Sequence, residues 1–202
     1  MTKHRLELFS DGVFAIVLTL LVLNLKVPVA FGFAGFLEMA PALLVHAASF
    51  FLVGVLWLNH HGALARVDKI SYPALLFNLL ALFWVTLLPF AAENAAYRPF
   101  DWLGASLIAF CCGAHLLSFM AMRLSSHSTV DDLSSMRRWR QTRIAAASCM
   151  VVVDLACAFL AWAWPWLGYA GGVMTTFGLL VLRSPPEAEH YFRRAAEAAA
   201  AA

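Results

Sequence analysis

Apolar residues in this sequence gather in blocks of about 20, the number a helix needs to cross ~30 Å of hydrocarbon. The blocks predict six spanning helices, at residues 5–27, 36–57, 72–92, 102–123, 144–164 and 167–182. Pro28 follows the first block and Pro165 lies between the last two. Because proline interrupts a helix, we expect helix boundaries at both positions. The pattern therefore predicts an all-α membrane protein.

Polar sequence divides these blocks into parts. The helical pattern of the second block continues towards Asp68, and a polar segment covers residues 125–143 between the fourth and fifth blocks. We expect residues 1–183 to form one six-helix transmembrane domain. Residues 184–202 are then a charged tail with an alanine-rich end.

The positions of the charges predict the orientation of the chain. Of 14 lysines and arginines, only Lys26 and Arg98 fall on the side opposite the N-terminus. Because basic residues favour the cytoplasmic side, both termini are expected in the cytoplasm of a multi-pass protein of the inner (plasma) membrane. Four tryptophans near the predicted outer boundary resemble an aromatic belt: Trp102, Trp162, Trp164 and Trp166.

Composition excludes several classes of protein. Of 202 residues, 62% are hydrophobic and 13% charged, against about 45–50% and about 25% in soluble domains. A net charge of +2 gives no footprint for nucleic acid. The four cysteines lie in apolar blocks without CxxC spacing, and no nucleophile, phosphate loop or HExxH motif appears. We expect neither an enzyme nor a cofactor.

The first predicted helix carries a carboxylate inside the membrane. Asp11 lies six residues after Arg5, about 9 Å along a helix axis. A charge at that depth is costly unless it is paired. The alternative is that Ser10 and Asp11 only cap a helix that begins at Gly12.

Residue counting places other polar side chains at the same depth, near the inner ends of the second and third helices. They predict a structural network at the base of the first helix, made of Arg5, Ser10, Asp11, Trp57, Asn59, His60, His61 and Asn78. Adjacent histidines on a helix point about 100° apart. Since no Cys, Asp or Glu stands at ligand spacing beside them, we expect no metal site.

Two further features leave alternatives open. Ile16, Leu20 and Leu23 share one helix face that Thr19 borders, a stripe that is typical of ordinary packing or of a lipid-facing surface. His115 and Asp154 lie within later apolar blocks and either pair with each other or mark an ion or proton path. No TVGYG filter is present, and no second copy of the six-helix pattern, so a symmetric pore would need several subunits.

The string RxxxFSDG from Arg5 to Gly12, continued by VFAI and TLLVL, resembles the first-helix signature of the transmembrane protein 175 family. That family comprises endolysosomal potassium channels and their bacterial relatives. The segments WLNHH from Trp57 and LPF from Leu88 are also similar to its bacterial members. The resemblance covers the first half of the chain, and beyond it only the topology agrees.

The resemblance implies a homotetramer in the membrane lipid, with the first helix of each subunit lining a pore for potassium ions. Ile16, Leu20 and Leu23 then match hydrophobic rings that replace a carbonyl filter, and Thr19 matches a hydroxyl ring near which potassium passes. Ser10 and Asp11, with Asn59 and the histidines of the second helix, match a polar network at the inner end. A proton leak is compatible with this pore.

Two rival functions remain. One is a secondary cation or metal transporter that uses Asp154, His115 or the pair His60 and His61, although no inverted repeat is evident. The other is a membrane scaffold without a pore.

Overall fold

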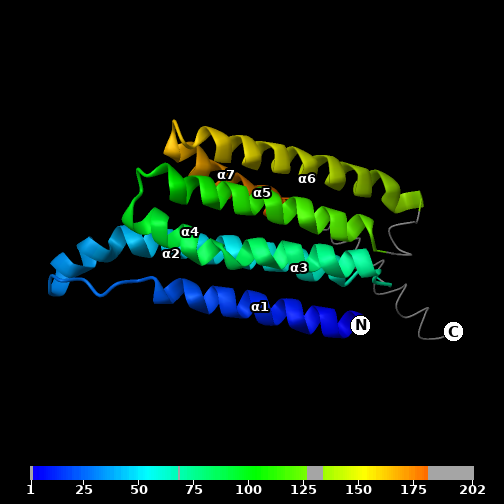
Figure 1. Ribbon diagram of the computed structural model, residues 1–202, viewed down its shortest axis with the longest axis horizontal. Helices are drawn as coiled ribbons and strands as arrows, with labels where there is room; N and C mark the ends of the chain where they lie inside the picture. The colour runs from blue at the N-terminus through cyan, green and yellow to red at the C-terminus, as the bar shows by residue number, and fades with distance from the viewer. Residues whose placement is uncertain (1, 68, 127–133, 182–202) are drawn as a thin grey trace.

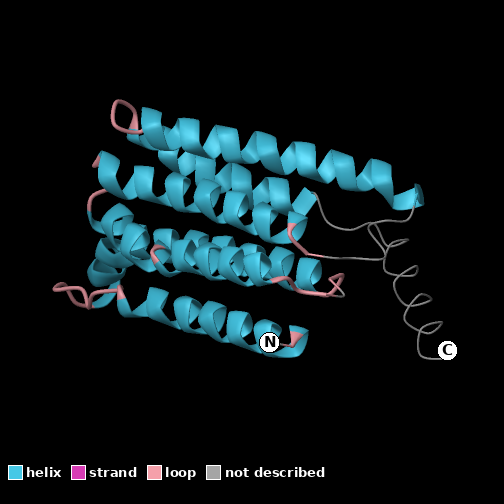
Figure 2. Cartoon of the chain, turned by 45° about the vertical axis from the view of Figure 1, so that its right-hand side comes forward, coloured by secondary structure: helices cyan, strands magenta, loops and turns pink. Residues whose placement is uncertain are grey.

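The computed structural model describes residues 2–67, 69–126 and 134–181, so the predicted tail at 184–202 lies outside the described residues. Its helices are α1 (Lys3–Leu23), α2 (Gly32–Leu64), α3 (Tyr72–Thr86), α4 (Leu88–Tyr97), α5 (Trp102–Leu124), α6 (Ser134–Leu160) and α7 (Pro165–Val181). They lie side by side along the long axis of the molecule (Figure 1) and form one helical bundle when the view is turned (Figure 2).

Five stretches are long and apolar enough to cross a bilayer. They are α1, α2, the α3–α4 pair taken together as Tyr72–Tyr97, α5, and Gln141–Leu160 of α6. Helix α7 has 17 residues, which is at the lower limit of about 17–25 for a spanning helix. The all-helical prediction is confirmed, with five to six membrane-length helices, and the chain is a multi-pass membrane protein.

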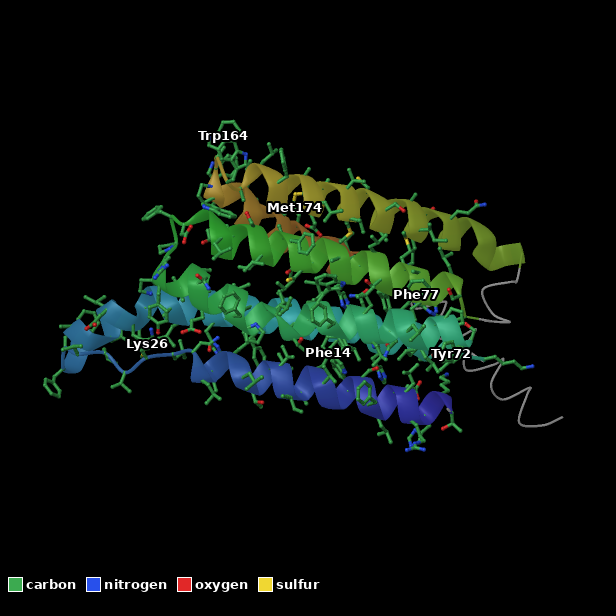
Figure 3. All side chains as sticks on the ribbon, in the orientation of Figure 1. Phe14, Lys26, Tyr72, Phe77, Trp164 and Met174 are labelled. Carbon is green, nitrogen blue, oxygen red and sulfur yellow. The ribbon has the colours of Figure 1, made fainter. Side chains whose placement is uncertain are left out.

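The bundle has two chemically different ends. Lys26 and Trp164 lie at one end and Tyr72 at the other (Figure 3). We call the first the tryptophan-rich end, after Trp102, Trp162, Trp164 and Trp166. The other is the arginine-rich end, where Arg66, Arg123 and Arg143 line one pocket.

Several helix boundaries differ from the prediction. Helix α1 ends at Leu23 rather than at residue 27, and the side chain and carbonyl of Asn24 bond to Pro89 and Tyr97 instead of continuing the helix. Helix α2 begins earlier, at Gly32, whose φ is 66°, and continues through Pro41 to Leu64. Helix α6 also begins earlier, at Ser134.

The third predicted helix is broken in two. Leu87 separates α3 from α4, and Pro89 occupies the first turn of α4. Proline lacks the N–H that would continue the α3 ladder, and its ring clashes with the carbonyl one turn earlier. The two halves still form one membrane-length stretch.

Helix α5 is the centre of the bundle and α1 is an edge. Helix α5 packs against α3, α4, α6 and α7, whereas α1 packs only against α2, α3 and α4 among the helix pairs with substantial contact. Small residues allow the close approach around α5: a Cβ added at Gly168 would overlap the carbonyl oxygen of Ala105. Helix α1 is held by one stripe of side chains, namely Leu6, Ser10, Phe14, Val17 and Leu21.

Candidate functional site

The face of α1 that points away from the bundle is apolar and open. Ile16 is 60% exposed, Leu20 42% and Leu23 75%. Thr19 is also exposed, and its hydroxyl donates to the carbonyl of Ile16 at 2.8 Å. Between Asp11 and Lys26 the sequence contains no ionisable side chain. The residues expected to form the constriction therefore lie on a surface that the subunit itself leaves uncovered.

The base of α1 is tied to α2 and α3 by a buried polar chain. Asn78 of α3 donates from Nδ2 to Ser10 Oγ at 3.2 Å, and its Oδ1 accepts from His60 Nε2 at 2.8 Å. All three side chains are buried. Since the amide oxygen can only accept, the bond fixes the proton of His60 on Nε2. The Nδ1 atom of His60 has no hydrogen-bond partner among the described residues.

Asp11 belongs to a second, half-buried contact. Its Oδ1 accepts from the indole Nε1 of Trp57 at 2.8 Å. The ring of Trp57 in turn lies against that of His61, with 5.6 Å between centroids. A carboxylate that accepts an N–H bond is stabilised in its position without a cationic partner. The helix base thus contains two polar contacts side by side rather than one network.

Two of the expected network residues lie elsewhere. Arg5 is exposed and forms no hydrogen bond or ion pair with Asp11. Asn59 donates to Val55 O within its own helix, and its Oδ1 accepts from Arg143 Nη2 at 3.5 Å. Asp11 was expected to pair with Arg5 or the histidines. It bonds instead to Trp57, because the rotation of α1 and α2 places the indole N–H beside the carboxylate.

Helix α1 is also fixed at its two termini. Lys3 Nζ donates to Ala65 O at 2.9 Å, at the C-terminal end of α2. At the opposite end Asn24 Nδ2 donates to Pro89 O at 2.7 Å, and the hydroxyl of Tyr97 donates to Asn24 O at 2.9 Å. The helix is therefore bonded to neighbouring elements at both ends of its span.

An aromatic cluster inside the bundle was missed in the sequence. Phe14 points from α1 into the interior (Figure 3), and its ring centroid lies 5.4 Å from that of His60 and 6.3 Å from that of His115. Phe119 lies 5.2 Å from His60 and 5.9 Å from His115. The spacing could have predicted that Phe14 is buried with Ser10, because residues four apart share one face of a helix.

His115 and Asp154 do not pair, so that alternative was wrong. His115 Nδ1 donates to Ala81 O at 3.0 Å, which joins α5 to α3. Asp154 Oδ2 accepts from the hydroxyl of Thr175 at 2.6 Å, which joins α6 to α7. Both polar groups are buried and each has a separate neutral partner.

The known proteins that this chain resembles are potassium channels and TMEM175 channels. The family model described as endosomal/lysosomal potassium channel TMEM175 matches residues 5–89. A potassium channel of Chryseobacterium sp. (strain P1-3) is 43% identical over 109 residues, 54% of this chain and 53% of that protein. The endosomal/lysosomal proton channel TMEM175 of Rattus norvegicus is 40% identical over 108 residues, 48% of this chain and 22% of that protein.

The fold extends the likeness over most of the chain. The crystal structure of a lysosomal potassium-selective channel TMEM175 homolog from Chamaesiphon minutus matches with a TM-score of 0.73 and 26% identity. The match covers 90% of this chain and 98% of that one. In sequence, the chain spans about half the length of the first bacterial relative, 53%. The matches to the first helices and to the whole bundle agree, and the chain belongs to the TMEM175 family.

Proposed function

We propose that this chain is one subunit of a potassium-preferring cation channel, with α1 of four copies around the pore. The observation that carries the proposal is the open, uncharged face of α1, an edge helix of the subunit. Such a face would be costly in water and requires lipid or other copies of the chain against it. Relatives named as potassium channels favour the second possibility.

The proposed pore works without a carbonyl filter. Rings of Ile16, Leu20 and Leu23 form a constriction, with Ile16 the narrowest, that empties of water and so blocks ions until it dilates. An apolar ring offers no ligand to replace lost water, so potassium, which releases its hydration shell more easily than sodium, passes in preference. The hydroxyl of Thr19 supplies a polar contact for the passing ion.

Two further properties belong to the proposal. Water that enters the dilated rings also provides a route for protons, and a relative is named as a proton channel. By the distribution of lysine and arginine, the arginine-rich end faces the cytoplasm of a cell whose inner membrane holds the channel.

Ion flux into liposomes tests the proposed constriction. Ile16→Asn is expected to raise potassium flux at least severalfold and to weaken discrimination against sodium, because the amide wets the ring. Val22→Asn is the matched control: Val22 is also exposed, at 50%, but lies on another side of the helix. Equal effects of the two substitutions would mean that ions pass elsewhere.

Cross-linking tests the assembly. Leu20→Cys, in a background in which the exposed Cys149 is serine, should form disulfides between subunits under mild oxidant. Leu44→Cys serves as a control, since Leu44 is 72% exposed but belongs to α2. Particles that remain monomeric in mild detergent, with no cross-link at Leu20, would exclude a pore built from α1.

A further inference from the structure

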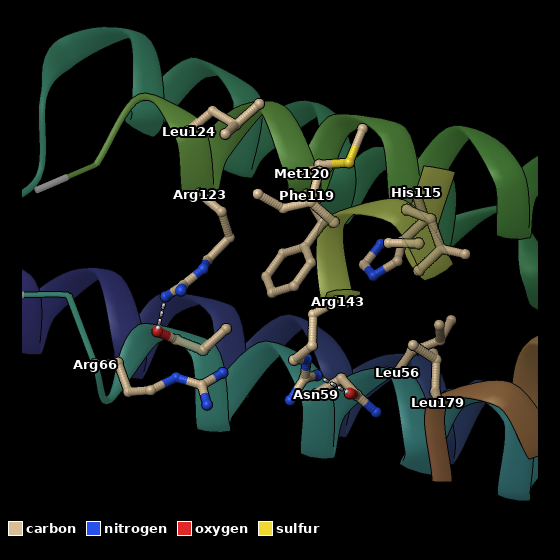
Figure 4. A pocket seen from close by; sticks show the side chains of 14 residues that line it. Leu56, Asn59, Arg66, His115, Phe119, Met120, Arg123, Leu124, Arg143 and Leu179 are labelled. Atoms are coloured by element: carbon tan, nitrogen blue, oxygen red, sulfur yellow. Dashed lines mark hydrogen bonds between the residues drawn. The ribbon is translucent and has the colours of Figure 1, made fainter. Parts of the chain in front are cut away.

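A pocket near the arginine-rich end is lined by residues of α2, α5, α6 and α7 and encloses about 110 Å³. Three guanidinium groups lie around it (Figure 4). Arg66 follows the end of α2, Arg123 belongs to the last turn of α5, and Arg143 comes from α6. Away from the arginines, the lining carries the apolar side chains of Leu56, Leu116 and Leu179, together with His115. The pocket thus combines a cationic mouth with an apolar floor.

Contacts within the protein hold the cationic groups in place. Arg123 Nη1 donates to Ala63 O at 2.8 Å, and Arg143 Nη2 donates to Asn59 Oδ1 at 3.5 Å. Arg66 is buried, with 8% exposure, and all three arginines contact other parts of the chain. A guanidinium has five N–H donors in a planar fork, so one group can contact the protein and a phosphate oxygen at the same time.

The depth of the arginines identifies the kind of ligand. Arg66 and Arg123 stand where the apolar stretches of α2 and α5 end, and Arg143 stands where that of α6 begins. This level corresponds to the lipid headgroups. Basic pockets between transmembrane helices at that level suit anionic lipid headgroups.

We propose that this pocket binds the phosphate group of an anionic membrane lipid, with the start of an acyl chain on the apolar floor. Free phosphate would use the arginines equally well but would leave Leu56, Leu116 and Leu179 uncovered. A phospholipid satisfies both parts of the pocket. Because Arg66 follows α2 while Arg123 and Arg143 belong to α5 and α6, a bound phosphate joins three elements at one point.

Lipid retention by the purified full-length protein tests the site. Native mass spectrometry and thermal unfolding are measured with phosphatidylglycerol, with phosphatidylcholine of the same acyl chains, and with inorganic phosphate. The test variant is Arg66→Gln with Arg143→Gln. Arg123 is kept because its bond to α2, at 2.8 Å to Ala63 O, is shorter than that of Arg143, at 3.5 Å to Asn59 Oδ1. The matched control is Arg98→Gln, which removes an exposed positive charge from the loop before α5.

The wild type is expected to retain phosphatidylglycerol in preference to phosphatidylcholine and to unfold at a higher temperature with it. The double variant should lose this preference roughly fivefold per arginine, since a basic residue near a lipid surface contributes about that factor. The control should keep it. Should the double variant fail to fold, Arg66→Lys with Arg143→Lys replaces it, with part of the preference expected to remain.

Three results would overturn the proposal. One is equal retention of the two lipids by the wild type. Another is an equal loss in the control, which would assign the effect to net charge. The third is stabilisation by inorganic phosphate as large as that by phosphatidylglycerol, which would make free phosphate the ligand.

Discussion

Helices α1 and α5 are both membrane-length and strongly apolar, yet they have opposite positions in the subunit. In the most apolar 18-residue stretch of each, 28% of α1 is buried against 61% of α5. Helix α5 is rich in glycine, alanine and cysteine and contacts neighbours on most sides, whereas α1 carries isoleucine and leucine on an open face. The sequence of α5 is constrained by the subunit. Packing within the subunit leaves the open face of α1 uncovered, and in the proposed channel this face lines the pore.

The largest loss of stability is expected from a substitution that disrupts the packing around α5. Gly168→Val should lower the yield of folded protein and destabilise it by about 3 kcal/mol, because the added carbon atoms would overlap the backbone of Ala105. Thermal unfolding followed by tryptophan fluorescence measures this. Gly12→Val is the counterpart in α1, where an added Cβ has nothing within 4 Å. It should leave the subunit folded and disturb only assembly or flux, and an equal loss of folded protein in both variants would remove the contrast between the helices.

The next effect concerns the inner face of α1. Asn78→Ala should destabilise the protein by about 2 kcal/mol, because it leaves buried Ser10 and His60 without their shared partner. Chemical unfolding in detergent measures the loss. Asn94→Ala is the control and should cost much less, since that amide donates to Phe90 O of its own helix and to no other group among the described residues.

A smaller effect is expected at the half-buried contact. Asp11→Ala and Trp57→Phe should each cost about 1 kcal/mol, because each removes one charge-assisted hydrogen bond, and the oligomer should weaken before ion preference changes. The double variant should lose little more than either single one, which a double-mutant cycle would detect. Normal assembly of Asp11→Ala with altered selectivity would place the carboxylate in the pore instead.

The smallest effect on the fold is expected at Thr19. Thr19→Ala removes a hydroxyl that bonds only to its own helix, so stability should change by less than about 0.5 kcal/mol. Potassium preference over sodium should nevertheless fall, with total flux changed less, in reversal-potential measurements. An unchanged ion preference would mean that this hydroxyl does not contact permeating ions.

Hydrophobic blocks were sufficient to predict the helical class, since burial in lipid requires apolar residues over a fixed length. They predicted six spans, and the structure has five to six helices of membrane length. They could not predict the break at Leu87, because a proline in the first turn of α4 leaves hydropathy unchanged. Nor could they give the start of α2 at Gly32, ahead of the block predicted from residue 36. Its continuation past residue 57 to Leu64 agrees with the helical pattern that runs towards Asp68.

At the candidate site, residue counting predicted the depth of polar groups but not their partners. Asp11, His60 and Asn78 were expected at one level. His60 and Asn78 do bond to each other, but their third partner is Ser10. The choice of Trp57 over Arg5 for Asp11 depends on the rotation of each helix, which depth alone does not determine. His115 and Asp154 found separate partners for the same reason.

The bonds at the two ends of α1 have a mechanical consequence. Helix α1 is bonded to its neighbours at both ends, through Lys3, Ser10 and Asp11 at one and through Asn24 at the other. A hinge movement about either end would break the bonds at the opposite end. The remaining low-cost motions of the helix are a twist about its own axis and a bow of the middle, where only apolar contacts hold it. Ile16 and Leu20 lie in that middle segment. In the proposed pore, widening at these residues would therefore come from bending or rotation of α1 between its two held ends, and not from a hinge movement about one end.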